Sequence, residues 1–109
     1  MDFILEHNYN AIDKCWMITL SGEIDIFNSD QIKTDLMNLI NATPADLHLD
    51  CQNLEYIDST ALGALVAVLK NVKNYEGSIH LFNVRPSLTK LFKITNLDKV
   101  FILEGETNA

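Results

Sequence analysis

A serine between an aspartate and a threonine stands directly before a predicted helix, within residues 56–63 (YIDSTALG). Helix N-termini offer unpaired N–H groups and the positive end of the helix dipole, so a phosphoryl group on Ser59 would be favoured there. It would add about 1.5 to 2 negative charges at neutral pH. Ser, Thr and Asp are also ordinary helix caps, so these residue types by themselves leave both a phosphoacceptor and a purely structural role open.

Catalysis by Ser59 is disfavoured by its neighbours. Hydrolase nucleophiles sit in a Gly-x-Ser-x-Gly turn and need a histidine base, whereas Asp58 and Thr60 flank this serine. The histidines fall in three different predicted strands with no convergent ligand spacing, so we expect neither a base nor a metal site. We therefore predict a protein that is not an enzyme and has no cofactor. The histidines are His7, His48 and His80.

Anion binding elsewhere in the chain stays open. Residues 85–87 (RPS) precede a predicted helix whose N–H groups could hold a phosphate or a nucleotide. A glycine-rich phosphate loop would strengthen this interpretation, but the sequence around these residues does not contain one.

The elements that must position Ser59 follow from the periodicity of apolar residues. Alternation predicts strands at residues 3–7, 15–20, 46–51, 78–83 and 100–103, the first two forming a hairpin. Helical spacing predicts helices from a capping box at Asn28 and Gln31 to about residue 41, through residues 62–72 to a stop near Gly77, and from Pro86 onward. The order β-β-α-β-α-β-α-β predicts an α/β fold, a mixed sheet of four to five strands covered by helices.

Composition limits the class of protein. With 109 residues, 48% of them hydrophobic, we expect residues 1–109 to form a single domain. The net charge is −7, which disfavours nucleic acids and anionic membranes and favours a partner with a basic face. Cys15 and Cys51 lie in apolar stretches and are expected to be reduced and buried. The N-terminus lacks a secretory pattern and no apolar run approaches the roughly 20 residues that span a bilayer, so a cytoplasmic protein is expected.

Residues 58–63 (DSTALG) resemble the signature loop of the STAS domain family, specifically the bacterial anti-sigma factor antagonists, whose usual form is Asp-Ser-Ser/Thr-Gly-Leu-Gly. Residues 22–25 (GEID) are similar to the family's Gly-Glu-Leu/Ile-Asp, and residues 91–97 (LFKITNL) to its Leu-Phe-x-Ile/Leu-Ser/Thr-Gly-Leu. Gly77 stands where the family commonly has glycine. Together these motifs cover essentially the whole chain.

The resemblance implies a regulator that is a substrate and not an enzyme. In this family the unphosphorylated antagonist binds an anti-sigma factor that is also a serine kinase, which releases the sigma factor for transcription. The kinase, which binds ATP, phosphorylates the serine after the aspartate, here Ser59, and a phosphatase restores the unphosphorylated form. The implied partner-binding residues are Asp25, Ile26, Phe27, Asp58, Thr60, Ala61 and Leu62.

Several roles stay open on the sequence. Asp25 either bonds a basic residue of the partner or caps the turn into the first helix, and Ile26 and Phe27 are either an interface anchor or core. Ala61 replaces the family's usual glycine, and its methyl group is expected to help the helix but to obstruct a closely approaching partner. This departure favours an alternative, a STAS-like module that binds a small molecule or nucleotide without being phosphorylated. Asn96 replaces another glycine and suits a left-handed helix end.

Overall fold

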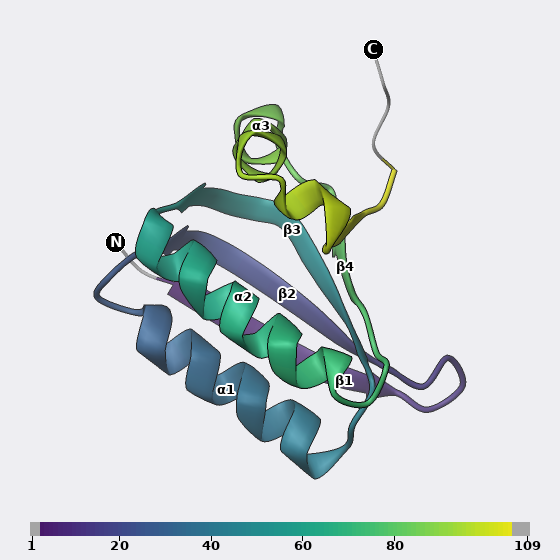
Figure 1. The fold of residues 1–109 in the computed structure, drawn as a ribbon. Helices are drawn as coiled ribbons and strands as arrows, with labels where there is room; N and C mark the ends of the chain where they lie inside the picture. Colours follow the sequence, from purple (N-terminus) through teal and green to yellow (C-terminus); the bar gives the residue numbers. More distant parts are fainter. Residues whose placement is uncertain (1–2, 106–109) are drawn as a thin grey trace.

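The structure is a computed structural model that describes residues 3–105 (Figure 1). The chain begins with an antiparallel hairpin of β1 (Phe3–Asn10) and β2 (Cys15–Ile24). In its turn the Asn10 side-chain oxygen accepts a hydrogen bond from the N–H of Ile12 at 3.0 Å, the usual way in which asparagine stabilises a turn. The predicted hairpin is confirmed.

After the hairpin, helices alternate with parallel strands, so the α/β fold and the predicted order of elements are confirmed. The five-stranded sheet has the order β1-β2-β3-β4-β5, and every pair after the first is parallel. The helices α1 and α2 lie side by side over one face of the sheet (Figure 1). The remaining elements are α1 (Ser29–Ala42), β3 (Asp46–Ile57), α2 (Ser59–Lys73), β4 (Ile79–Phe82), α3 (Pro86–Ile94), the 3-10 turn η1 (Leu97–Lys99) and β5 (Ile102–Leu103).

Alternation along the strands separates an apolar face from a polar one. On β3, Leu47 and Leu49 are buried in the core beneath the helices, while Asp46 and His48 point to the opposite face and keep part of their surface exposed. The same alternation holds on β4, so the opposite face of the sheet carries polar side chains from neighbouring strands. This face becomes important below.

The strand β3 continues six residues beyond the predicted end at residue 51. It does so because β2 also runs further than predicted, and the two remain paired as far as Ile24↔Ile57 across two register shifts. Periodicity alone missed this extension, since a shift in register disrupts strict alternation. Its consequence is that the carboxyl ends of β2 and β3 lie together, directly beside the start of α2.

The helix ends are partly as predicted. The predicted capping box at Asn28 is wrong, because the Asn28 side chain does not cap α1. It binds residues at the end of β2 instead: it accepts a hydrogen bond from the N–H of Asp25 and donates one to the carbonyl of Glu23. At the end of α2 the left-handed residue is Glu76 and not Gly77. The left-handed conformation of Asn96 after α3 is confirmed, with φ 61°.

Candidate functional site

The helix α2 begins at Ser59, and its cap is the carboxylate of Asp58. The Oδ1 atom of Asp58 accepts a hydrogen bond from the N–H of Ala61 at 2.8 Å, as an N-terminal cap does. Ser59 and Thr60 occupy the first turn and are exposed to solvent. The structure therefore presents the predicted acceptor serine on the surface, at the positive end of a 15-residue helix.

The same carboxylate also binds the loop that joins β2 to α1. The Oδ2 atom of Asp58 accepts a hydrogen bond from the N–H of Ile26 at 3.0 Å, and the Asp58 N–H donates to the carbonyl of Ile24 at 3.1 Å. Two segments more than 30 residues apart in the chain are thus held together by the side chain and the main-chain N–H of one residue. Asp58 is consequently a positioning residue whose oxygens both point inward, toward backbone N–H groups.

Asp25 organises this loop from within. Its Oδ1 atom accepts a hydrogen bond from the N–H of Phe27 at 2.9 Å, and its carbonyl accepts from the N–H of Ser29 at 2.8 Å. Of the two roles that the sequence left open, the cap of the turn into α1 is the one that these bonds support. The half-buried carboxylate has a second oxygen, which can accept a hydrogen bond from a partner.

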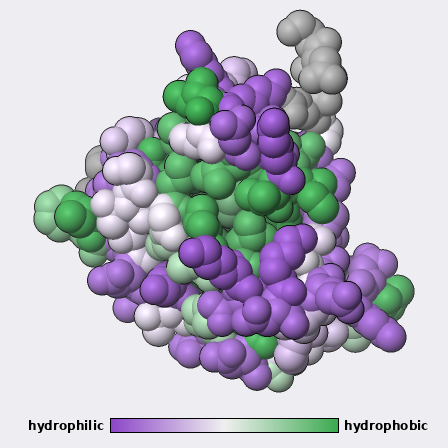
Figure 2. All heavy atoms as spheres, in the orientation of Figure 1, coloured by the Kyte–Doolittle hydropathy of each residue, from purple (hydrophilic) through white to green (hydrophobic). Residues whose placement is uncertain are grey.

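The apolar residues of the loop project into solvent. Ile26 is 64% exposed and Phe27 is 93% exposed, so neither belongs to the core. Figure 2 shows the loop between β2 and α1 as an apolar projection at the left edge of the molecule. We call one surface the docking loop. It consists of Ile26 and Phe27, between β2 and α1, together with Ser59 and Thr60 in the first turn of α2. Aromatic side chains this exposed are typical of surfaces that bind another protein.

Ala61 and Leu62 do not belong to this surface. Ala61 is 0% exposed and Leu62 is 7% exposed, both packed into the core below α2. In this conformation neither side chain is presented to a partner, because a helix of 3.6 residues per turn places these positions toward the sheet. The Ala61 methyl group fills core space and does not stand in the path of a partner.

Comparison with known proteins identifies the family. The model of the STAS domain matches residues 6–108, nearly the whole sequence. This chain belongs to the STAS domain family. It is 32% identical over 90 residues to the anti-sigma-B factor antagonist of Bacillus subtilis strain 168. The alignment covers 83% of this chain and 82% of the relative. The corresponding antagonist of Staphylococcus aureus strain NCTC 8325 is 28% identical over 94 residues. This alignment covers 85% of this chain and 87% of the relative.

Solved structures agree with this assignment of the fold. An anti-sigma factor antagonist from Mycobacterium paratuberculosis superposes on this STAS domain with a TM-score of 0.82 at 20% identity, covering 98% of this chain and 89% of the other. The Bacillus cell fate determinant SpoIIAA in its phosphorylated form gives a TM-score of 0.70 at 22% identity. The superposition covers 96% of this chain and 93% of the other. The Bacillus subtilis relative is named as an antagonist of an anti-sigma factor, which is a regulatory and not an enzymatic role.

Other features of the STAS domain fall outside the docking loop. A hollow of about 380 Å³ beside α3 is lined by Pro86, Thr89 and Lys90 among others, and by none of the residues predicted to bind a protein partner. It therefore lends no support to a small molecule bound beside Ser59. Among residues 3–105, no helix combines the length and the apolar character needed to cross a membrane.

The expectation that the histidines do not come together in space is wrong for two of them. His48 and His80 are direct neighbours on β3 and β4, and together with Asp46 they place three ligand-type atoms within 4.8 Å of one another. Spacing along the chain missed this cluster, because strand pairing and not sequence separation brings the residues together. His7, on β1, is not part of it.

Proposed function

We propose that this STAS domain is a bacterial, cytoplasmic anti-sigma factor antagonist that docks onto an anti-sigma factor serine kinase through the docking loop. Phosphorylation of Ser59 ends the docking. The observation that carries the proposal is the double role of Asp58, whose two oxygens hold the N–H groups of Ile26 and Ala61. The serine and the exposed apolar residues are thereby parts of a single surface.

The physical effect of the phosphate follows from this geometry. The dipole of α2 favours it by about 0.3 to 1 kcal/mol at an exposed site. The carboxylates of Asp25 and Asp58, on the same loops, oppose it by repulsion. The fold therefore tolerates the modification, and the main consequence falls on the partner, which meets new bulk and about 1.5 to 2 negative charges beside its apolar contact.

Similarity to known antagonists supports the same role. The relatives from Bacillus subtilis and Staphylococcus aureus are named for opposing the anti-sigma-B factor, and SpoIIAA has been solved in both phosphorylated and unphosphorylated forms. By analogy, the kinase supplies ATP, a separate phosphatase removes the phosphate, and the STAS domain is the substrate of both. Asp25, Ile26, Phe27 and Thr60 then contact or shape the interface with the kinase.

The test compares binding to the cognate anti-sigma factor kinase for wild type, Ser59→Ala and Ser59→Asp. We expect Ser59→Ala to bind as wild type does, and Ser59→Asp to bind about 100-fold more weakly or worse, because a charge is introduced into the interface. Ser87→Asp is the matched control, since Ser87 is also exposed in the first turn of a helix, α3. Calorimetric titration measures the affinities.

Intact-mass spectrometry after incubation with the kinase and ATP tests the acceptor. Wild type should gain a single phosphoryl group, and Ser59→Ala should gain none. Unchanged affinity of Ser59→Asp, or a phosphoryl group that remains in Ser59→Ala, would contradict the switch at Ser59.

A further inference from the structure

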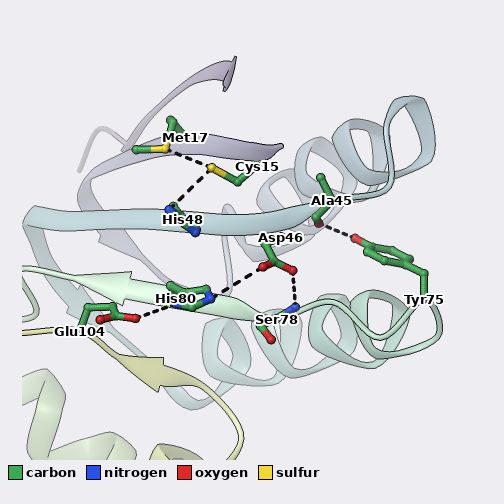
Figure 3. Close-up of polar contacts among 9 residues, drawn as sticks. All are labelled: Cys15, Met17, Ala45, Asp46, His48, Tyr75, Ser78, His80 and Glu104. Atoms are coloured by element: carbon green, nitrogen blue, oxygen red, sulfur yellow. Dashed lines mark hydrogen bonds and ion pairs between the residues drawn. The ribbon is translucent and has the colours of Figure 1, made fainter. Parts of the chain in front are cut away.

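The amino ends of β3 and β4 bring a second group of side chains together, far from the docking loop. Asp46 is the first residue of β3, and His48 pairs directly with His80 across the parallel ladder. These residues alternate with buried leucines and isoleucines, so their side chains share the sheet face opposite the helices. Figure 3 shows them pointing toward one another, and their nearest ligand atoms all lie within 4.8 Å.

His80 is held in one orientation by Glu104. The Nδ1 atom of His80 lies 2.7 Å from Glu104 Oε1, and because an ionised carboxylate only accepts, Nδ1 is the donor. In the neutral ring the lone pair is then on Nε2, which faces Asp46 Oδ2 at 3.9 Å. A carboxylate bonded to the far nitrogen of a histidine is the arrangement by which proteins orient metal-binding imidazoles.

Asp46 is also fixed in place. Its Oδ1 atom accepts a hydrogen bond from the N–H of Ser78 at 2.8 Å, at the turn that leads into β4. That bond leaves Oδ2 on the side of His80. One oxygen thus positions the carboxylate, and the other is directed into the cluster.

His48 completes the group. Its Nδ1 atom lies 3.7 Å from the thiol sulfur of Cys15, and its other nitrogen lies on the side of the ring away from that thiol (Figure 3). The rings of His48 and His80 are close, with centroids 4.7 Å apart. Partial burial, and then the neighbouring His80, lower the pKa of His48, and the neutral imidazole is the form that binds metals.

We propose that Asp46, His48 and His80 bind a divalent cation of the late first transition series, Zn²⁺ first among them, with Glu104 as the positioning residue of His80. Two imidazoles and one carboxylate suit Zn²⁺, whereas Mg²⁺ and Ca²⁺ prefer all-oxygen sites. Tetrahedral zinc with ligands at about 2.0 to 2.1 Å needs ligand atoms about 3.4 Å apart, a small inward movement of the three side chains.

The cation would cross-link β3 to β4 and, through Glu104, to the segment after β5. It would bind at the opposite end of β3 from Ser59, roughly 30 Å along the strand. The inference is therefore independent of the proposed function, and either can fail without the other. The net charge of −7 adds a general attraction for cations.

Calorimetric titration of the metal-free protein with Zn²⁺ tests the site. We expect one saturable site in wild type and no saturable response to Mg²⁺. His48→Gln and His80→Gln should each remove saturable Zn²⁺ binding. His7→Gln is the matched control, because His7 is another sheet histidine outside the cluster, and it should bind as wild type does. Circular dichroism of the metal-free variants establishes that each is folded.

Glu104→Gln tests the positioning role. We expect Zn²⁺ affinity to fall about 10- to 100-fold, as for other carboxylates behind metal-binding histidines. The visible absorption of the Co²⁺-loaded protein should change in Glu104→Gln, while the thermal unfolding of the metal-free variant stays near that of wild type. A purely structural role would leave the Co²⁺ spectrum unaltered and would overturn this assignment.

Other outcomes would overturn the site itself. These are a flat Zn²⁺ titration of folded wild type, and saturable binding that survives in the His48→Gln, His80→Gln double variant. An equal loss of Zn²⁺ binding in His7→Gln would also overturn the site, since it would indicate a nonspecific effect of replacing a histidine. A thiolate-to-Co²⁺ charge-transfer band would show that Cys15 is a ligand, and would overturn the proposed donor set.

Discussion

The two ends of β3 carry two kinds of site. At the carboxyl end, Asp58 and Ser59 are consecutive in the sequence and lie at the start of α2, with Ile26 and Phe27 added by one nearby loop. At the amino end, the polar cluster takes Asp46 and His48 from β3, His80 from β4 and Glu104 from the segment after β5. The first site is a short motif that two long-range hydrogen bonds of Asp58 join to the loop before α1, whereas the second exists only through strand register.

This difference separates two levels of information. A motif at a helix start can be recognised along the chain, because capping and phosphate binding depend on local N–H groups. A cluster across parallel strands depends on which residues pair, and a shift of one residue would send each side chain to the other face of the sheet. Experiments at each end of the molecule can sharpen or break this contrast.

The largest effect is expected for Phe27→Ala, which removes the most exposed apolar side chain of the docking loop. If Phe27 anchors the proposed interface, its loss should weaken binding to the proposed anti-sigma factor kinase by about 2 to 4 kcal/mol. The free energy of unfolding should change by less than about 0.5 kcal/mol, since the ring has little contact within the domain. Calorimetric titration and urea unfolding measure the two quantities.

The control for this change lies at the other end of the molecule. Ile12 is 92% exposed in the turn between β1 and β2, on the far side from the docking loop (Figure 1). Ile12→Ala should leave binding unaltered. Equal losses in both variants would indicate that exposed apolar area in general, and not the docking loop, drives association.

The next effect is expected for Asp58→Ala. Removing the cap of α2 and the acceptor for the Ile26 N–H should lower the free energy of unfolding by about 2 kcal/mol, of which the cap accounts for about 1. Kinase binding should fall as well, because the two parts of the docking loop are released from each other. Urea unfolding and titration provide both measurements.

Glu55→Ala is the matched control, because it removes an exposed carboxylate from β3 three residues earlier. If Asp58→Ala were as stable as Glu55→Ala, the bridging role given to Asp58 would be refuted.

The smallest effect concerns Cys51, on the stretch of β3 between the two sites. Burial, with a smaller contribution from Asp50, raises the pKa of its thiol from 9.0 to about 12. The unfolded thiol therefore ionises at lower pH than the folded one, and stability falls as the pH rises above 9. By pH 10 the loss from this group is about 1.4 kcal/mol.

Comparison with Cys51→Ala isolates this contribution. The variant is less stable at neutral pH because it leaves a cavity in the core, but it lacks the thiol. The difference in unfolding free energy between wild type and variant, measured by urea unfolding, should therefore shrink between pH 8 and pH 10. A constant difference over this range would show that the buried thiol does not resist ionisation.

Much of the fold was predictable from the sequence, because each element carries a local signal. Pro86 begins α3 and the left-handed Asn96 follows its end, as their backbone preferences predicted. The extension of β3 to Ile57 was not predictable, since its pairing with β2 passes through register shifts. The capping box at Asn28 failed because the asparagine found partners in the preceding strand.

The candidate site was predicted in part, and the errors have one cause. The residue types at Asp58 and Ser59 indicated a helix start, and the structure places them there. The sequence did not tell which neighbours face the solvent, so Ala61 and Leu62, which are buried, were included among the expected partner-binding residues.

By itself, the sequence determined the order of the elements and the chemistry of the loop before α2, because helix caps and apolar periodicity act over a few residues. Only the tertiary structure decided that Asp58 holds the N–H of Ile26, that Phe27 is exposed, and that His48 meets His80. These outcomes depend on strand register and on packing between distant segments. Neither is encoded in any short stretch of the chain, since each arises only when the whole sheet is assembled.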